Sequence, residues 1–200
     1  MDEKARKKLV NIAWKELEKF IKEWQRDTYR WNNEIDIQTD LASRIKTAYK
    51  KLKKDTQWAR YKGVVGGFEK GQIYSRIYCE PKTFYEYTKD KRDICRPDIV
   101  IYNDIENPIS PKEPWKIKQN DPILWICEIK FQPEWGNKRP NKRTNWDLKK
   151  IRYLLRQKDG TEYACWLNIS RESAKSGCGI NRKILSHGRL RKYYVTLPGG

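Results

Sequence analysis

Two segments of the sequence place ionisable side chains within apolar runs. Asp98 directly precedes the apolar residues 99–102, and Glu128 and Lys130 interrupt the apolar run of residues 123–131. Burying a charge is costly unless the charge is paired or coordinates a metal. Because alternate side chains of a β-strand project from the same face, Glu128 and Lys130 are predicted to share one patch.

These side-chain types are suited to metal-assisted cleavage of phosphodiesters. If the strand of Asp98 pairs with that of Glu128, the two carboxylates supply hard oxygen ligands for Mg²⁺, with Mn²⁺ as a substitute. A bound divalent cation polarises the phosphate and lowers the pKa of bound water. Lys130 either stabilises the pentavalent phosphate or, with a depressed pKa, helps to deprotonate water, and the sequence leaves both roles open.

The elements that must position these residues follow from hydrophobic periodicity. Apolar residues at three- and four-residue steps predict an amphipathic helix over residues 2–31. A second helix is expected after Thr39 or Asp40, either of which can cap it, and extends to about residue 54. Strands are predicted at residues 72–79, 94–102, 123–131, 163–169 and 193–197, and a further helix at 145–157. This order predicts an α/β domain with a central mixed β-sheet flanked by helices.

Arg96-Pro97-Asp98, followed by Glu128-Ile129-Lys130 and set in this order of elements, resembles the signature of the PD-(D/E)XK, restriction-endonuclease-like nucleases. The resemblance covers about residues 34–169. It implies a restriction-endonuclease-like core, here with an N-terminal helical extension. It also implies that Asp98 and Glu128 are metal ligands and that Lys130 is catalytic.

The same resemblance implies a further carboxylate from the helix before the first core strand. Glu34 matches best and is expected to be catalytic, with Asp36 and Asp40 as substitutes and Glu80 as a weaker candidate. Acidic residues at this place also cap helices, which is the alternative interpretation. The helix beginning near residue 145 carries Asp147 and lysines, as in many members of the family, but lacks the glutamine that some members have.

The composition indicates a polyanionic partner. The chain has 44 Lys+Arg against 26 Asp+Glu, a formal net charge of +18, so nucleic acid, in the first place DNA, is the expected partner. Residues 136–160 are strongly basic and follow the proposed active strand directly. The residues of this stretch expected to bind nucleic acid are Lys138, Arg139, Lys142, Arg143, Lys149 and Lys150.

Other function classes are disfavoured. The longest apolar runs are too short to span a bilayer, so no membrane association is expected. A single histidine excludes mechanisms that need paired histidines, and the five cysteines have no zinc-knuckle or redox spacing. The cysteines are therefore expected to be reduced and mostly buried, in a cytoplasmic protein.

We expect one domain over residues 1–200, with N-terminal helices at 1–54, a catalytic core at 72–170 and a basic C-terminal segment at 171–200. Residues 104–122 are expected to form a long excursion between strands, and the glycines of residues 63–71 a turn. The predicted function is a Mg²⁺-dependent DNA endonuclease of restriction, defence or junction-resolving type, compatible with a homodimer. The alternatives are a non-catalytic nucleic-acid-binding protein, in which Glu128 and Lys130 form a structural pair, and an RNA-directed nuclease.

Overall fold

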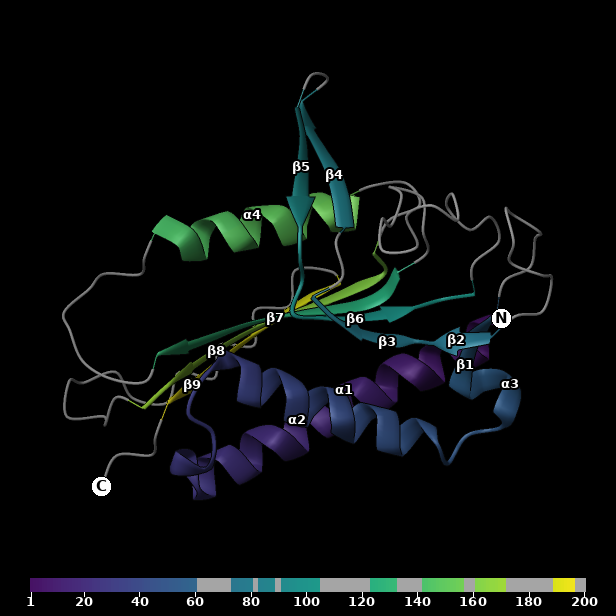
Figure 1. The fold of residues 1–200 in the computed structure, drawn as a ribbon, viewed down its shortest axis with the longest axis horizontal. Helices are drawn as coiled ribbons and strands as arrows, with labels where there is room; N and C mark the ends of the chain where they lie inside the picture. Colours follow the sequence, from purple (N-terminus) through teal and green to yellow (C-terminus); the bar gives the residue numbers. More distant parts are fainter. Residues whose placement is uncertain are drawn as a thin grey trace.

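The computed structural model describes residues 1–60, 73–80, 83–88, 91–104, 123–132, 142–156, 161–171 and 189–196 of the chain. The glycine-rich turn predicted at 63–71 lies outside these residues, as does nearly all of the predicted excursion at 104–122. The described part consists of a central sheet with helices on both faces (Figure 1).

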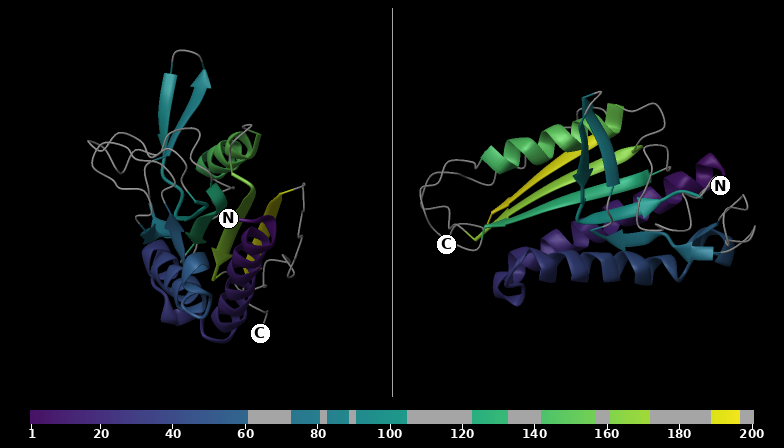
Figure 2. Two further views of the ribbon diagram at one scale, coloured as in Figure 1. Left: turned by 90° about the vertical axis from the view of Figure 1, so that its right-hand side faces the viewer. Right: turned by 45° about the horizontal axis from the view of Figure 1, so that its top comes forward.

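Two long antiparallel helices, α1 (Glu3–Arg26) and α2 (Glu34–Tyr49), cover one face of the sheet and lie side by side (Figure 2). The apolar periodicity of α1 turns a continuous stripe toward the core, and Asp2 caps the helix by accepting a hydrogen bond from the Ala5 amide at 2.7 Å. The Tyr49 hydroxyl donates to the Leu9 carbonyl at 2.9 Å, which ties the end of α2 to the first half of α1. The short helix η1 (Thr28–Arg30) lies between them, and α3 (Lys54–Gln57) follows α2.

The prediction that Thr39 or Asp40 caps the second helix was wrong. The helix begins at Glu34, because the Asn33 side chain accepts a hydrogen bond from the Asp36 amide at 2.9 Å and satisfies one of the free donors of the first turn. Helix α2 also ends at Tyr49, short of residue 54. This earlier start places Glu34 in the first turn of α2.

The central sheet has the strand order β3-β6-β7-β8-β9. Strand β3 (Ile77–Cys79) pairs antiparallel with β6 (Ile99–Tyr102), which pairs antiparallel with β7 (Ile123–Gln132). Strands β7, β8 (Tyr163–Ser170) and β9 (Leu190–Thr196) run parallel. Helix α4 (Lys142–Arg156) lies between β7 and β8 in the chain and covers the second face of the sheet. The sheet is thus mixed, as predicted.

Two of the predicted strands divide into shorter ones. Residues 72–79 form β2 (Ile73–Ser75) and β3, which separate at Arg76, and residues 94–102 contribute to β5 (Lys91–Cys95) and β6. Strand β2 pairs with β1 (Trp58–Arg60), and β5 pairs with β4 (Thr83–Thr88) in a hairpin that extends from the sheet on the side of α4 (Figures 1 and 2).

Arg76 explains the break between β2 and β3. Its side chain is fully buried and donates to the Tyr102 carbonyl at 3.1 Å and to the Asp104 carboxylate at 2.6 Å. The same carboxylate lies 2.8 Å from the amino group of Met1. A buried cation needs such partners, and they fix the chain at the end of β6.

Apolar residues on the two faces of the sheet build two layers of core. Trp125, Cys127 and Ile129 of β7 pack toward α1 and α2, whereas Ile126 packs toward α4 with Trp166 of β8. Both faces are therefore covered, which gives the α/β architecture expected from the order of elements. No helix in the described ranges has the length and apolar character required to cross a bilayer.

Candidate active site

The register of β6 and β7 brings Asp98 and Glu128 together. Ile99 of β6 lies opposite Cys127 of β7, so the next step of the antiparallel register places Asp98 opposite Glu128. Opposed side chains of an antiparallel pair project from the same face. Both carboxylates therefore lie on the α4 face of the sheet, where Lys130 follows two residues later.

Asp98 is held by hydrogen bonds to its side chain and to its backbone. Its Oδ2 accepts from the Ile129 amide at 2.5 Å, next to Glu128 on β7. Its carbonyl accepts from Nε2 of Gln38 at 2.5 Å and from the Glu80 amide at 3.1 Å. The three contacts come from β7, from α2 and from the residue after β3, so three neighbouring parts of the fold hold Asp98 in position.

Lys130 lies within ion-pair distance of three carboxylates. Its Nζ lies 3.3 Å from Oε1 of Glu128, 3.5 Å from Oδ2 of Asp147 and 3.9 Å from Oε2 of Glu34. These groups come from β7, α4 and α2, which are the three layers of the fold. We call Asp98, Glu128, Lys130, Glu34 and Asp147 the acidic cluster.

The structure brings Glu34 to the cluster and directs Asp36 and Asp40 elsewhere. Oε1 of Glu34 accepts from the Phe131 amide at 3.1 Å, so α2 is joined to β7 directly beside Lys130. Asp36 accepts from the Asn32 amide at 2.9 Å. Asp40 accepts from Nε1 of Trp31 at 3.0 Å and from Nε of Arg44 at 3.0 Å. Of these three acids at the start of α2, Glu34 is the one that contacts the cluster.

Glu80 has an exposed side chain at the edge of the cluster. Its φ of 48° lies in the left-handed region, which is uncommon for a residue other than glycine. This backbone turn directs the Glu80 amide to the carbonyl of Asp98. Glu80 thus contributes to the position of Asp98 through its backbone.

The two opposed carboxylates have raised pKa values. Burial raises the pKa of Asp98 to about 6, although the hydrogen bond from Ile129 and the charge of Lys130 act in the opposite direction. Burial and the neighbouring Asp98 raise the pKa of Glu128 to about 8. The site therefore favours added positive charge, whether a proton or a metal ion.

At Lys130 the neighbouring charges outweigh the effect of burial on the pKa. Burial by itself lowers the pKa of its amine, but the surrounding carboxylates, with Glu128 the strongest, raise it above the ordinary value of 10.5. The amine is therefore a protonated ammonium at neutral pH, and it remains a cation beside Glu128.

The donor set at Asp98 and Glu128 fits a divalent metal. Among the described residues, no three His, Cys, Asp or Glu side chains form a group that could hold a metal ion by themselves. A cation here would take one oxygen from each of Asp98 and Glu128 and fill its remaining positions with water or substrate oxygens. That arrangement suits Mg²⁺, which usually keeps several waters and is bound by one or two carboxylates.

The predicted nucleic-acid contacts are only partly described. Lys138 and Arg139 lie outside the described residues, and Lys142 and Arg143 belong to α4, with side chains that are not described. On the same helix, Lys149 is exposed to solvent. Lys150 is directed toward the cluster, with its Nζ 4.0 Å from Oδ1 of Asp147.

Two residues near the cluster were missed by reasoning from the sequence. Gln38 is only 5% exposed. A polar residue on the apolar face of a helix is the signal that could have identified it. Asn168 lies opposite Lys130 in the parallel register, and its buried Oδ1 has no hydrogen-bond partner among the described residues. Nothing in the strand pattern distinguished Asn168 from an ordinary strand residue.

The cysteines agree in part with expectation. Cys127 and Cys165 are buried and lie opposite each other on β7 and β8 as free thiols, whereas Cys79 is free but exposed. The prediction of mostly buried cysteines therefore holds for two of these three residues; the side chains of Cys95 and Cys178 are not described.

Comparison of the chain with protein-family models, with curated proteins and with solved structures finds no match in any of the three.

Proposed function

We propose that this chain is a metal-dependent nuclease that hydrolyses phosphodiester bonds of DNA, with Asp98, Glu128 and Lys130 at its active centre. One observation carries the proposal: two partly buried carboxylates lie opposite each other on paired strands, with a lysine ammonium 3.3 Å from one of them. Carboxylates repel the phosphates of a nucleic acid. A cluster of carboxylates in a phosphate-binding site is therefore explained by a metal ion that lies between the carboxylates and the substrate.

In this proposal Asp98 and Glu128 bind Mg²⁺ or Mn²⁺ through their carboxylate oxygens. When bound, the ion polarises the scissile phosphate and lowers the pKa of a water nucleophile. The hydrogen bond from Ile129 to Oδ2 orients Asp98 and leaves its second oxygen for the ion. Glu128, whose pKa is raised to about 8, would release its proton to hold the ion as a carboxylate.

Lys130 acts on the phosphate as a cation. Because the carboxylates around it raise the pKa of its amine, the electrostatic role is better supported than the role of a general base. Glu34 and Asp147 position the ammonium from opposite layers of the fold. Through its bond to the Phe131 amide, Glu34 also holds the end of β7 in place.

The arrangement of elements adds support. The elements that build the sheet and its flanking helices come along the chain in the order that the restriction-endonuclease-like resemblance implies, namely α2, β3, β6, β7, α4 and β8. The short helix α3 and the strands β1, β2, β4 and β5 are inserted between them. The net charge of +18 favours a polyanionic substrate, and two opposed free thiols, Cys127 and Cys165, fit a reducing, cytoplasmic location. Enzymes that cut both strands of duplex DNA usually dimerise to reach both strands, so the proposal for that substrate is compatible with a homodimer.

A second function, nucleic-acid binding without catalysis, is favoured by the ion pairs themselves. Lys130 already has three carboxylates within 3.9 Å, and these contacts satisfy its buried charge without a metal. In that case Glu128 and Lys130 are a structural pair. The protein then binds nucleic acid with a strong dependence on salt and cuts none.

Cleavage assays separate the two functions. The purified protein is incubated with supercoiled plasmid, linear duplex, single-stranded DNA, branched DNA and RNA, with Mg²⁺, with Mn²⁺ and with EDTA. The nuclease proposal expects cleavage of at least one DNA substrate that requires the metal. Cleavage of RNA alone would transfer the proposal to an RNA-directed nuclease.

Matched variants link any cleavage to the cluster. Asp98→Ala and Lys130→Ala are expected to lower the rate by at least about 100-fold, because each removes charge stabilisation at the reacting phosphate. Asp27→Ala and Lys22→Ala remove the same side-chain types at exposed positions and should leave the rate unchanged. Equal rates in all four variants would assign the cleavage to a contaminant or to another site.

A further inference from the structure

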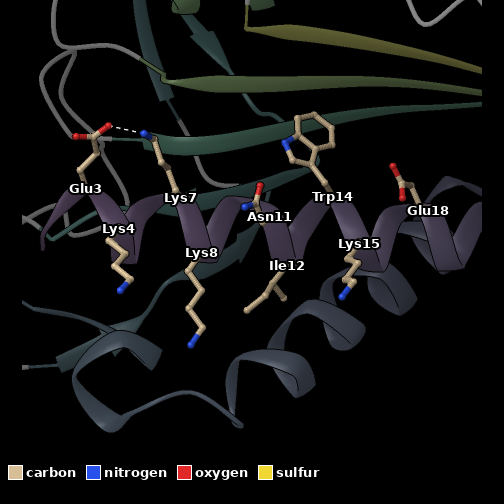
Figure 3. Close-up of a pocket in the computed structure, with 9 residues that line it drawn as sticks. All are labelled: Glu3, Lys4, Lys7, Lys8, Asn11, Ile12, Trp14, Lys15 and Glu18. Atoms are coloured by element: carbon tan, nitrogen blue, oxygen red, sulfur yellow. Dashed lines mark ion pairs between the residues drawn. The ribbon is translucent and has the colours of Figure 1, made fainter.

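A second surface with the features of a binding site lies on α1, away from the acidic cluster. A hollow of about 810 Å³ is lined by residues of α1 between Glu3 and Glu18. Figure 3 shows these side chains on both flanks of the helix. Lys4, Lys8 and Lys15 extend from one flank, and Lys7 and Asn11 extend from the other. We call this surface the α1 groove.

The α1 groove is basic, and its charges are available to a ligand. Lys7 pairs with Glu3 at 2.6 Å, as marked in Figure 3. Lys4, Lys8 and Lys15 are exposed and form no ion pair with any residue in the described ranges. Their positions repeat at helical spacing, so the three ammonium groups lie along one side of the helix axis. The row matches a ligand with regularly spaced negative charges.

The groove also has an apolar side chain on each flank (Figure 3). Trp14, on the flank of Lys7 and Asn11, is 5% exposed, packs edge-on against Trp125 at 5.5 Å and carries the guanidinium of Arg191 over its ring at 4.6 Å. Ile12, on the flank of Lys4, Lys8 and Lys15, is partly buried and packs against the core. The stems of these three lysines can lie beside Ile12 while their ammonium groups reach outward. Arg191 of the edge strand β9 adds another cation at the border of the groove.

The position of the groove separates it from the acidic cluster. The Leu9 carbonyl of α1 accepts a hydrogen bond from Tyr49 at the far end of α2, whereas Glu34 begins α2 beside the cluster. The 16 residues of α2 therefore separate the two places along the helix axis, about 24 Å at 1.5 Å per residue. At 3.4 Å per base pair, this length corresponds to about seven base pairs of duplex DNA.

We propose that the α1 groove binds the phosphate backbone of nucleic acid, with Lys4, Lys8 and Lys15 each contacting phosphate oxygens. An anionic membrane surface fits less well, because a helix that lies in a membrane interface inserts an exposed apolar face. The apolar face of α1, including Leu9, Ala13 and Leu17, is instead fully buried against the sheet and α2. The inference concerns binding and stands independently of whether the acidic cluster is catalytic.

A pair of charge-reversal variants tests the proposal. Lys4→Glu, Lys8→Glu and Lys15→Glu are combined in one protein, and Lys50→Glu, Lys51→Glu and Lys53→Glu in a control. Lys50, Lys51 and Lys53 are exposed residues that follow α2 outside the groove, so both proteins lose the same net charge. Acidic residues near the start of α1 are favourable to the helix, and circular dichroism verifies that both variants are folded.

Binding is measured by fluorescence anisotropy of labelled duplex and single-stranded oligonucleotides in EDTA, over a series of salt concentrations. The groove variant is expected to bind at least about tenfold more weakly than the control variant, and its log–log salt slope should fall by roughly two to three, since each phosphate contact contributes about 0.9. A Lys→Gln triple variant of the groove should show an intermediate loss.

Two results would overturn the proposal. Equal losses of affinity in the groove and control variants would mean that only the net charge attracts nucleic acid. Unchanged oligonucleotide binding, together with lost binding to vesicles that contain anionic lipid, would assign the groove to a membrane surface. Because EDTA prevents metal-dependent cleavage, failure of the proposed nuclease activity does not affect this measurement.

Discussion

Replacing Glu128 by Gln is expected to stabilise the metal-free protein at about pH 8 and to change its stability little at about pH 5. Burial and Asp98 raise the pKa of Glu128 from its ordinary value of 4.5 to about 8, and 13% of the side chain is exposed. The folded state therefore holds a proton that the unfolded state has released throughout this pH window. Stability must fall as pH rises through the window, because the unfolded state binds fewer protons there.

The size of the effect follows from the same two values. At about 1.4 kcal/mol for each tenfold change in proton affinity, ionised Glu128 lowers the free energy of unfolding by on the order of 4 kcal/mol at the upper end of the window. A neutral glutamine avoids this cost. For a chain of this size, 1 kcal/mol shifts Tm by about 2–4 °C, so the variant should melt roughly 8–16 °C higher at alkaline pH. Lys130 keeps Asp147 and Glu34 as partners in the variant.

The assay is thermal unfolding monitored by circular dichroism, from acidic to alkaline pH, in EDTA and in Mg²⁺. Glu18→Gln, at an exposed position, is the matched control and should follow the wild type throughout. Mg²⁺ should raise the Tm of the wild type at alkaline pH and have little effect on Glu128→Gln. A Glu128→Gln protein that is less stable than the wild type at alkaline pH, or equally shifted at every pH, would show that ionised Glu128 does not destabilise the fold.

Three other substitutions have definite expected outcomes. Asp104→Asn should lower stability at neutral pH by about 3–5 kcal/mol, because buried Arg76 loses its charged partner. Burial raises the pKa of Asp104, but the amino terminus and Arg76 lower it by more, so the net pKa is below its ordinary value. The contribution of Asp104 to folding stability is therefore present above about pH 4 and is lost in acid. The stabilities of the variant and the wild type should converge during an acid titration. Trp125→Ala, at a fully buried position, should cost about 3–5 kcal/mol in urea unfolding. Gln38→Leu should lower cleavage by about 10- to 100-fold with a small change in Tm, since Gln38 positions Asp98; an unchanged rate would remove that role.

The core of the candidate site was predictable because it depends on local alternation. Glu128 and Lys130 share a face for the simple reason that they are two residues apart on a strand. Asp98 joined them through the pairing of two apolar segments, which the order of elements already suggested. These parts of the site need no knowledge of side-chain packing between distant elements.

The contributions of the helices were harder to predict. The start of α2 was misplaced because Asn33, Thr39 and Asp40 are all good helix-capping types, and sequence preferences do not separate Asn33 from Asp40. The side-chain bond of Asn33 decides the boundary and places Glu34 at the cluster. Gln38 reaches Asp98 only through the packing of α2 on the sheet, which periodicity does not specify.

The division of the predicted strand at Arg76 has a similar origin. Residues 72–79 read as one strand, but the partners of Arg76 come from Tyr102, Asp104 and the Thr56 carbonyl, all distant in sequence. Their combined effect exceeds the local preference for extended backbone. Tertiary contacts of this kind override propensity and are visible only in the folded chain.

Crystallography with Mn²⁺ can show directly whether Asp98 and Glu128 share a divalent cation beside Lys130. Crystals of the wild type and of Asp98→Asn are soaked in Mn²⁺, and anomalous difference maps are compared. A single strong peak is expected between the Asp98 and Glu128 carboxylates in the wild type, and this peak should be lost in the variant. A wild-type map without a peak at these carboxylates, with Glu128 still paired to Lys130, would contradict a shared cation site.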